Sequence, residues 1–345
     1  MWSNDTKDVL LLFLCVWTAT IGSSHGFSAL HNTGNCMQSS LSSSTITFDT
    51  TRKMTTMETD IQTMVDQLTI EEQEVAARSS YRYFLASSSL AKDNDEKEDK
   101  EQDRVKAARK VAARHWIAEK GNTKRAFSRL QKTIKYRQEA NIDSIRVCFD
   151  PNHPDYAQLS EYRLGLLPHL SSAKVFCRGH DRQNRTIYTV VPRYEMVHEG
   201  WTDQWFTPAY CAYSLERALA CNELLLSSDD KVVAVFDYTG WQLRNAPPIP
   251  TTRRFLSTLQ SHYPEQIHAV YLVNTPRVFR VFWRLVKPFV EIPVEFVTGP
   301  AECQKAFADT IDPDQAQPFM LPNGQQADPV DTDRYLAEIP FNQPY

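Results

Sequence analysis

The sequence has few of the residues that build phosphate-binding loops. Its 345 residues include only ten glycines against nineteen prolines, and no G-x-G-x-x-G or G-x-x-x-x-G-K segment. Such glycines let the backbone approach phosphate closely, so their absence argues against a glycine-rich nucleotide-binding fold. The chain also lacks H-E-x-x-H, which excludes the usual zinc-protease helix. Its single G-x-S-x-G match, "GSSHG" at residues 22–26, directly follows an apolar run near the start of the chain and does not join a strand to a helix, so it predicts no nucleophile elbow.

Cysteine spacing and net charge exclude further classes. The seven cysteines contain no C-x-x-C pair, which argues against a zinc site. Scattered single cysteines are typical of reduced core residues. The net charge is −4, whereas nucleic-acid-binding domains are normally basic. The sequence therefore predicts no metal site, no cofactor and no nucleic-acid partner.

The polar residues form no recognisable catalytic constellation. His153, His169, His180 and His198 are scattered without metal-ligand spacing. Asp237 follows an apolar run, at the position where α/β enzymes place functional carboxylates, but a lone carboxylate there is more often a hydrogen-bonded turn former. We therefore predict no catalytic residues and no enzyme, and we rank an enzyme last among the alternatives.

The first part of the chain is typical of a leader. Residues 9–21 form an apolar run of roughly 13 residues, which is too short to cross a bilayer but suits a signal-peptide core. Residues 1–26 are therefore predicted to be signal-peptide-like. Residues 27–57 are rich in Ser and Thr, with Asp49 as their one acidic residue, and are predicted to be transit-like or disordered.

Together these two segments resemble the bipartite leader of algae with secondary plastids, which implies a plastid location. A secretory signal followed by a flexible spacer is the alternative, and it implies the endomembrane system. Translation from Met54 or Met57 would instead leave the protein in the cytoplasm.

A helical module is predicted at residues 58–150. Thr69 and Glu72 match a capping box ahead of a helical pattern, and two more helices follow a charged segment at residues 91–104. That segment has no apolar side chain larger than alanine. It therefore reads as a charged linker or as an exposed helix face.

Strands alternate with helices in residues 151–345. "AKVFCR" and "RTIYTVVP" flank a run of turn formers and predict a hairpin-like pair. "KVVAVFDYTG", "IHAVYLVNTP" and "PVEFVTG" predict three buried strands with helical patterns between them. This order predicts an α/β fold with a mixed, largely parallel sheet that helices flank.

The segment "NTPRVFRVFWRLVKPF", from Asn274 to Phe289, combines a broad apolar surface with a narrow basic stripe. All four of its charged residues are basic, and spacings of three, four and three place them on one face of a helix. These residues are Arg277, Arg280, Arg284 and Lys287.

Several segments resemble the CRAL-TRIO lipid-binding family. "RVKAARKVAARHWIAEKGNTKRAFSRLQKTIKYRQE" is similar to the small helical module that precedes such domains, and "VFCRGHDRQNRTIYTVVPR" to their first strand pair. "VVAVFDYTGW", "FLSTLQSHYPEQIHAVYLVNTPRVFRVFWRLVKPF" and "MLPNGQQADP" follow in the family's order. The resemblance covers roughly residues 71–335 and is most specific at residues 232–289. The family includes transfer proteins for phosphatidylinositol and alpha-tocopherol.

The resemblance implies an apolar pocket that encloses one lipid or other small hydrophobic molecule, with residues 277–290 as a membrane-contacting gate helix. A monomer would bind this ligand, meet the membrane surface transiently, and transfer or present its cargo. The alternatives are a ligand-free, membrane-peripheral interaction scaffold and a lipid-modifying enzyme. The four basic residues of the gate are the implied membrane contacts. The implied pocket residues are Tyr188, Val235, Asp237, Trp241, Val273, Phe279, Phe282, Trp283, Val286 and Phe289.

The chain departs from the family at the positions that bind an inositol phosphate headgroup. Lys120 and Glu265 match the family's pattern, but Glu119 stands where an arginine is expected, and the stretch after "KPF" is shorter. "NGQQ" also replaces the family's Gly-Gly. A neutral or weakly polar ligand is therefore at least as well supported as a phosphoinositide. Such ligands include a sterol, tocopherol, carotenoid, galactolipid or phosphatidylcholine.

Overall fold

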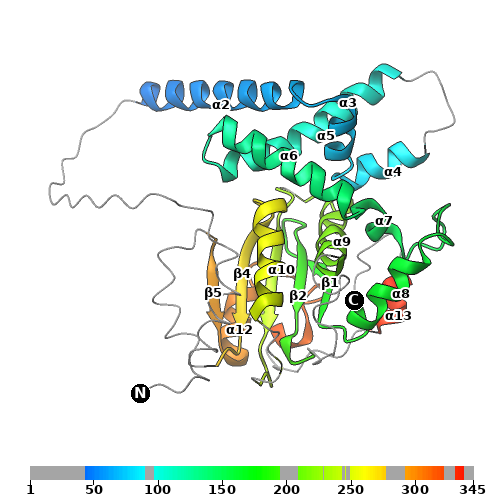
Figure 1. Ribbon diagram of the computed structural model, residues 1–345. Helices are drawn as coiled ribbons and strands as arrows, with labels where there is room; N and C mark the ends of the chain where they lie inside the picture. The colour runs from blue at the N-terminus through cyan, green and yellow to red at the C-terminus, as the bar shows by residue number, and fades with distance from the viewer. Residues whose placement is uncertain are drawn as a thin grey trace, which may run out of the picture.

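The computed structural model describes residues 43–89, 97–194, 209–227, 229–242, 245, 249–276, 292–321 and 331–337. Figure 1 shows a layer of helices against one end of a sheet that carries further helices on its faces. The predicted fold class is confirmed, because a helical region precedes a five-stranded, mostly parallel sheet. Within the described ranges, no helix is long and apolar enough to cross a bilayer.

The helical module has an apolar core of its own. Its helices are α2 (Ser43–Asp66), α3 (Ile70–Ala77), α4 (Tyr81–Ser89), α5 (Lys97–Ala118), α6 (Thr123–Glu139) and α7 (Ile142–Val147). Met64, Val65 and Leu130 are fully buried where α2 and α6 pack on α5. Thr69 and Glu72 form the predicted capping box, which satisfies two backbone N–H groups at the start of α3.

Two boundaries differ from the predicted ones. Helix α2 begins at Ser43 and passes through the boundary predicted at residue 57. Ser and Thr disfavour helix locally, but the second half of α2 buries Ile61 and Met64 in the module core, and this packing outweighs propensity. Helix α5 begins at Lys97, inside the charged segment, in agreement with the exposed-helix alternative.

The sheet has the strand order β1-β2-β3-β4-β5. The first pair is an antiparallel hairpin, as predicted, and every later pair is parallel. The strands are β1 (Val175–His180), β2 (Thr186–Val190), β3 (Val232–Asp237), β4 (Ile267–Val273) and β5 (Val294–Val297). Valine and isoleucine dominate the parallel strands because both faces of the sheet are covered.

Helices cover the two faces of the sheet in separate groups. The remaining elements are α8 (Ser160–Leu170), the 3-10 turn η2 (Pro192–Tyr194), α9 (Tyr210–Leu224), α10 (Ile249–His262), α12 (Gly299–Phe307), η6 (Pro318–Met320) and α13 (Thr332–Ala337). α8, α9, α10 and α13 contribute to a large apolar cluster on one face. α12 and η6 contribute to a smaller cluster on the other. We call these the α9 face and the α12 face.

Candidate functional site

The α9 face of the sheet carries a continuous apolar surface. Strand register aligns its side chains in two rows that run across the four neighbouring strands β2 to β5. We call these eight residues the apolar floor: Tyr188, Ala234, Val270 and Val294 in one row, and Val190, Phe236, Leu272 and Phe296 in the other. Four of them are only partly buried, namely Val190, Phe236, Val294 and Phe296. Two of them, Val294 and Phe296, lie on the edge strand β5, and the other two lie on β2 and β3. Apolar side chains of this size are normally covered in a folded protein, so this surface can still accept an apolar partner.

The structure brings together only some of the predicted pocket residues. Tyr188 lies in the floor, and Trp241 packs against the same cluster, edge-on to the Tyr238 ring at a centroid distance of 6.1 Å. Val235 and Val273 point the other way, into the α12 face, where both are 0% exposed. Their assignment to one pocket with Tyr188 is therefore not supported.

The reason for this difference is the alternation of side chains along a strand. Adjacent strand residues point to opposite faces, so Val235 and Phe236 cannot share one. In the uninterrupted apolar run "VVAVF", the sequence does not indicate which alternate residues point to which face of the sheet.

Asp237 is a structural residue and does not face the floor. Its carboxylate is fully buried and pairs with Arg193 Nη1 at 2.5 Å, and its other oxygen accepts the Thr239 N–H at 3.0 Å. A carboxylate that binds a backbone N–H two residues later is an Asx turn. The turn-former interpretation is therefore confirmed, and the pocket assignment of Asp237 is not supported.

The other predicted site residues fall into two groups. The Glu265 carboxylate accepts a hydrogen bond from Lys231 Nζ at 3.3 Å. Lys120 is exposed in the turn between α5 and α6. The remaining pocket and membrane-contact predictions lie outside the described residues: Phe279, Phe282, Trp283, Val286, Phe289, Arg277, Arg280, Arg284 and Lys287.

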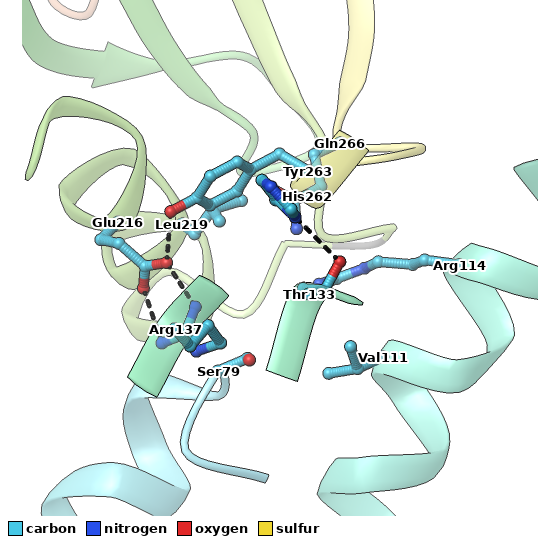
Figure 2. A pocket seen from close by; sticks show the side chains of 10 residues that line it. All are labelled: Ser79, Val111, Arg114, Thr133, Arg137, Glu216, Leu219, His262, Tyr263 and Gln266. Carbon is cyan, nitrogen blue, oxygen red and sulfur yellow. Dashed lines mark hydrogen bonds and ion pairs between the residues drawn. The ribbon is translucent and has the colours of Figure 1, made fainter. Parts of the chain in front are cut away.

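A buried charge network, which the sequence did not reveal, joins the helical module to the domain that contains the sheet (Figure 2). Glu216 of α9 is 1% exposed and accepts hydrogen bonds from Arg137 Nη1 at 2.6 Å, from Arg146 Nη2, and from the Tyr263 hydroxyl at 3.0 Å. Burial alone would raise the pKa of Glu216, but the two guanidinium groups outweigh it and lower this pKa to about 2. Glu216 is therefore a permanently charged anchor at neutral pH.

A small polar cavity adjoins this network (Figure 2). It lies between the module and α9, and its volume of about 20 Å³ suits one water molecule and is far too small for a lipid. His262 stacks on Tyr136 beside it, with centroids 4.0 Å apart. Burial, followed by the charge of Arg129, lowers the pKa of His262 to about 4, so the imidazole is neutral at pH 7.

The buried cysteine thiols are not activated as nucleophiles. Burial raises the pKa of Cys148 to about 12 and of Cys177 and Cys303 to about 11, so these thiols stay protonated at neutral pH and are poor nucleophiles. In the described part of the chain, no group of three or more His, Cys, Asp or Glu side chains is arranged to hold a metal ion.

Comparison with known proteins gives a consistent result. Residues 170–317 match the family model described as the CRAL/TRIO domain. Phosphatidylinositol transfer protein PDR17 of Saccharomyces cerevisiae is 23% identical over 214 residues, 60% of this chain and 55% of that protein. The human alpha-tocopherol transfer protein-like protein is 30% identical over 96 residues, 26% of this chain and 28% of the relative. The chain thus spans about half of the yeast relative's length and less of the human one's.

A solved structure supports the fold alone. The crystal structure of Sfh5 superposes with a TM-score of 0.51 at 16% identity, and the match covers 81% of this chain and 95% of that chain. At this identity the similarity concerns the fold and not the ligand.

Proposed function

Since residues 170–317 form a CRAL/TRIO domain, we propose that this chain binds a single lipid or similar small hydrophobic molecule over the apolar floor and carries or presents it between membranes. The observation that carries this proposal is the floor itself: eight aligned side chains, all apolar but for the Tyr188 hydroxyl, half of them only partly buried. The name of the yeast relative, a phosphatidylinositol transfer protein, supports it, and so does that of the human relative, which is named alpha-tocopherol transfer protein-like.

The order of the parallel strands supports a segment that covers the apolar floor. α9 connects β2 to β3 and α10 connects β3 to β4, and both pack on the α9 face. Parallel strands are joined by right-handed crossovers, so successive connections in one direction along a sheet fall on the same face. The connection from β4 to β5 includes residues 277–290, which we propose to be the gate helix above the ligand.

Elementary energetics explain why such a cover would help transport. Exposing an acyl chain to water costs about 0.8 kcal/mol per CH₂ group. A lipid enclosed between the floor and the gate avoids most of that cost during transfer. The basic stripe of residues 277–287 would then meet lipid phosphates when the gate opens, with about 1 kcal/mol from each cation near an anionic surface.

The floor favours a ligand whose bulk is apolar. No charged side chain belongs to either of its rows. Glu265 is already paired with Lys231, and Asp237 with Arg193. We therefore propose a neutral or weakly polar ligand, bound without catalysis. Lipid bound by the purified protein, identified by native mass spectrometry after exposure to a total lipid extract, tests this directly.

Two matched phenylalanine substitutions separate binding from folding. Phe296→Ala shortens a partly buried floor residue, whereas Phe307→Ala empties a 2% exposed position on the α12 face. We expect Phe296→Ala to lose at least tenfold in lipid occupancy with little loss of stability. Phe307→Ala should cost about 3–5 kcal/mol of unfolding free energy while the folded fraction keeps its lipid. Equal occupancy in both variants would contradict the assignment of the floor.

The gate has its own test. Substituting Phe282→Asp together with Trp283→Asp should abolish transfer between vesicles, because two carboxylates cannot enter the bilayer interface or the pocket without a large desolvation cost. Normal transfer by this variant would rule out the gate. A folded wild-type protein that binds no lipid would instead favour the scaffold alternative.

The leader is proposed to direct the protein to a plastid. Residues 1–42 lie outside the described part of the chain, so the proposal rests on the signal-like and Ser/Thr-rich composition. A fluorescent fusion of residues 1–57 should enter plastids, and its retention in the cytosol would contradict the proposal.

A further inference from the structure

Positive charge is concentrated in one part of the helical module. Residues 104–137 hold twelve of the 38 Lys and Arg residues and one of the 42 Asp and Glu residues. This stretch therefore carries +11 in a chain whose net charge is −4, which leaves −15 on the rest. Such an asymmetry creates a local positive field that the overall charge conceals.

Helix α6 divides these charges between two faces. Its inward face buries Ala126, Leu130 and Ile134 in the core of the module. Two of its arginines contact the domain that contains the sheet. Arg137 binds Glu216, and Arg129 binds Glu119 at 3.0 Å and donates to the last carbonyl groups of α10.

The outward face of α6 keeps its charges in solvent. Helical spacing places Lys124, Arg125, Lys132 and Lys135 on one side, and all four are exposed. Within the described residues, no ion pair involves Lys124, Arg125 or Lys132, while Lys135 pairs with the exposed Glu139 at 3.5 Å. Glu139 therefore limits this surface at the last turn. We call these four residues the α6 basic face.

We propose that the α6 basic face docks the protein onto an anionic lipid surface. Lys124 and Lys135 lie about 16 Å apart along the helix axis, which spans several headgroups. Exposed cationic side chains along one face of a helix suit a charged plane. The assignment to lipid, in preference to another polyanion, rests on the proposed function, because the cargo must be collected from membranes.

The aromatic residues of α6 argue against single-stranded nucleic acid as the partner. Such partners are normally held by stacking their bases on exposed aromatic rings next to the cations. Here Phe127 packs against the module core and Tyr136 stacks on His262. The contact on the outward face is therefore purely electrostatic, and it should weaken as salt rises.

A triple neutralisation with a matched control tests the proposal. The test variant combines Lys124→Gln, Arg125→Gln and Lys132→Gln. The control removes the same charge at three other exposed positions, on α10, α12 and α13, with Arg254→Gln, Lys305→Gln and Arg334→Gln. The readout is sedimentation with phosphatidylcholine vesicles, with and without phosphatidylserine.

Each cation near an anionic surface changes affinity about fivefold, so the test variant should bind the phosphatidylserine vesicles about a hundredfold more weakly. The control should change less than about threefold, and neither variant should change binding to pure phosphatidylcholine. Equal weakening of both variants would overturn the proposal. So would binding of the wild-type protein to RNA or duplex DNA, at matched phosphate concentration, that is at least as tight as vesicle binding.

Lipid occupancy of the same variants distinguishes this inference from the proposed function. The α6 basic face is remote from the floor in sequence and is not part of its rows, so native mass spectrometry should show unchanged cargo in the test variant. Normal cargo with unchanged vesicle affinity would overturn only the docking surface. No cargo in the wild-type protein would overturn the proposed function, whatever the vesicle result.

Discussion

Glu216→Gln should strongly destabilise the protein, because it removes the carboxylate that binds both buried guanidinium groups and leaves Arg137 with only a longer contact to Asp143, at 3.4 Å. The side chains of Arg137 and Arg146 are 6% and 1% exposed, and Glu216 itself is 1% exposed. Removing one partner of a buried ion pair typically costs about 3–5 kcal/mol, because the remaining charge stays desolvated and uncompensated. The pKa of Glu216 gives a similar magnitude. Its fall from 4.5 to about 2 corresponds to about 3 kcal/mol of differential stabilisation of the charged form.

Urea unfolding at pH 7 measures this cost directly. A suitable control is Glu139→Gln, since the exposed pair of Glu139 with Lys135 should contribute no more than about 0.5 kcal/mol. Replacing the whole network by apolar groups, with Glu216→Met, Arg137→Leu and Arg146→Met, should recover most of the lost stability. A cost below about 1 kcal/mol for Glu216→Gln would refute the reasoning, because the charges would then be adequately solvated without their partner.

The pH dependence gives an independent check with a defined sign. The pKa of Glu216 is lower in the folded than in the unfolded chain, so its contribution is complete above the unfolded value. That contribution is lost as the pH falls from about 5 toward 2, where the folded carboxylate also takes up a proton. The wild-type protein should lose this stability in that window, and Glu216→Gln should show a flatter profile. Parallel profiles would contradict the assignment.

Three further substitutions test local geometry. Gly179 has φ +69°, and a Cβ there would lie 2.0 Å from the Gln315 carbonyl oxygen, so Gly179→Ala should cost about 2–5 kcal/mol in urea unfolding. Gly299 has φ +74°, and a Cβ there would meet nothing within 4 Å, so Gly299→Ala should cost only about 1–2 kcal/mol. An equal cost for the two alanine variants would contradict the proposed clash with Gln315. Tyr335→Phe removes the hydroxyl that accepts a hydrogen bond from the buried Cys177 N–H at 2.9 Å, so it should lower the unfolding free energy by about 1–3 kcal/mol. The Cys177 amide should then exchange its hydrogen faster. Unchanged protection of this amide would contradict the assignment.

The sequence predicted the order of helices and strands well, because that order depends on local patterns. The capping box at Thr69 and Glu72, the antiparallel hairpin and the three parallel strands were all readable from residue type and spacing. Helix α2 was only partly readable. Its Ser/Thr-rich first half matches a leader composition, and its helical state emerges only with the packing of its second half on α5.

The site was less predictable, because two of its features depend on the tertiary structure. These are the face of the sheet to which a side chain points and the partner that a buried charge binds. Val235 and Phe236 are equally apolar neighbours, and only the position of α9 decides which of them faces the floor. The residue type of Glu216 does not by itself distinguish it from an exposed charged residue of a helix. A signal was present, however: α9 has small or apolar residues on every side, so a charge within it had to be buried and therefore paired.

Helix α9 is anchored to several separate parts of the fold. All residues from Tyr210 to Glu223 are buried, and its polar side chains bind separate parts of the fold. Glu216 binds α6 and α7, Arg217 donates to the Tyr335 carbonyl oxygen of α13, and Glu223 accepts from Ser80 and from the Arg82 N–H at the start of α4.

Any movement of α9 away from the sheet would therefore break several buried charge-assisted hydrogen bonds together, each far costlier to lose than an apolar contact with a lipid. Helix α9 is therefore a fixed wall beside the apolar floor. Under the proposed function, a lipid would have to enter without displacing α9, and this argument disfavours movement of the helical module, which binds α9 through Arg137 and Arg146.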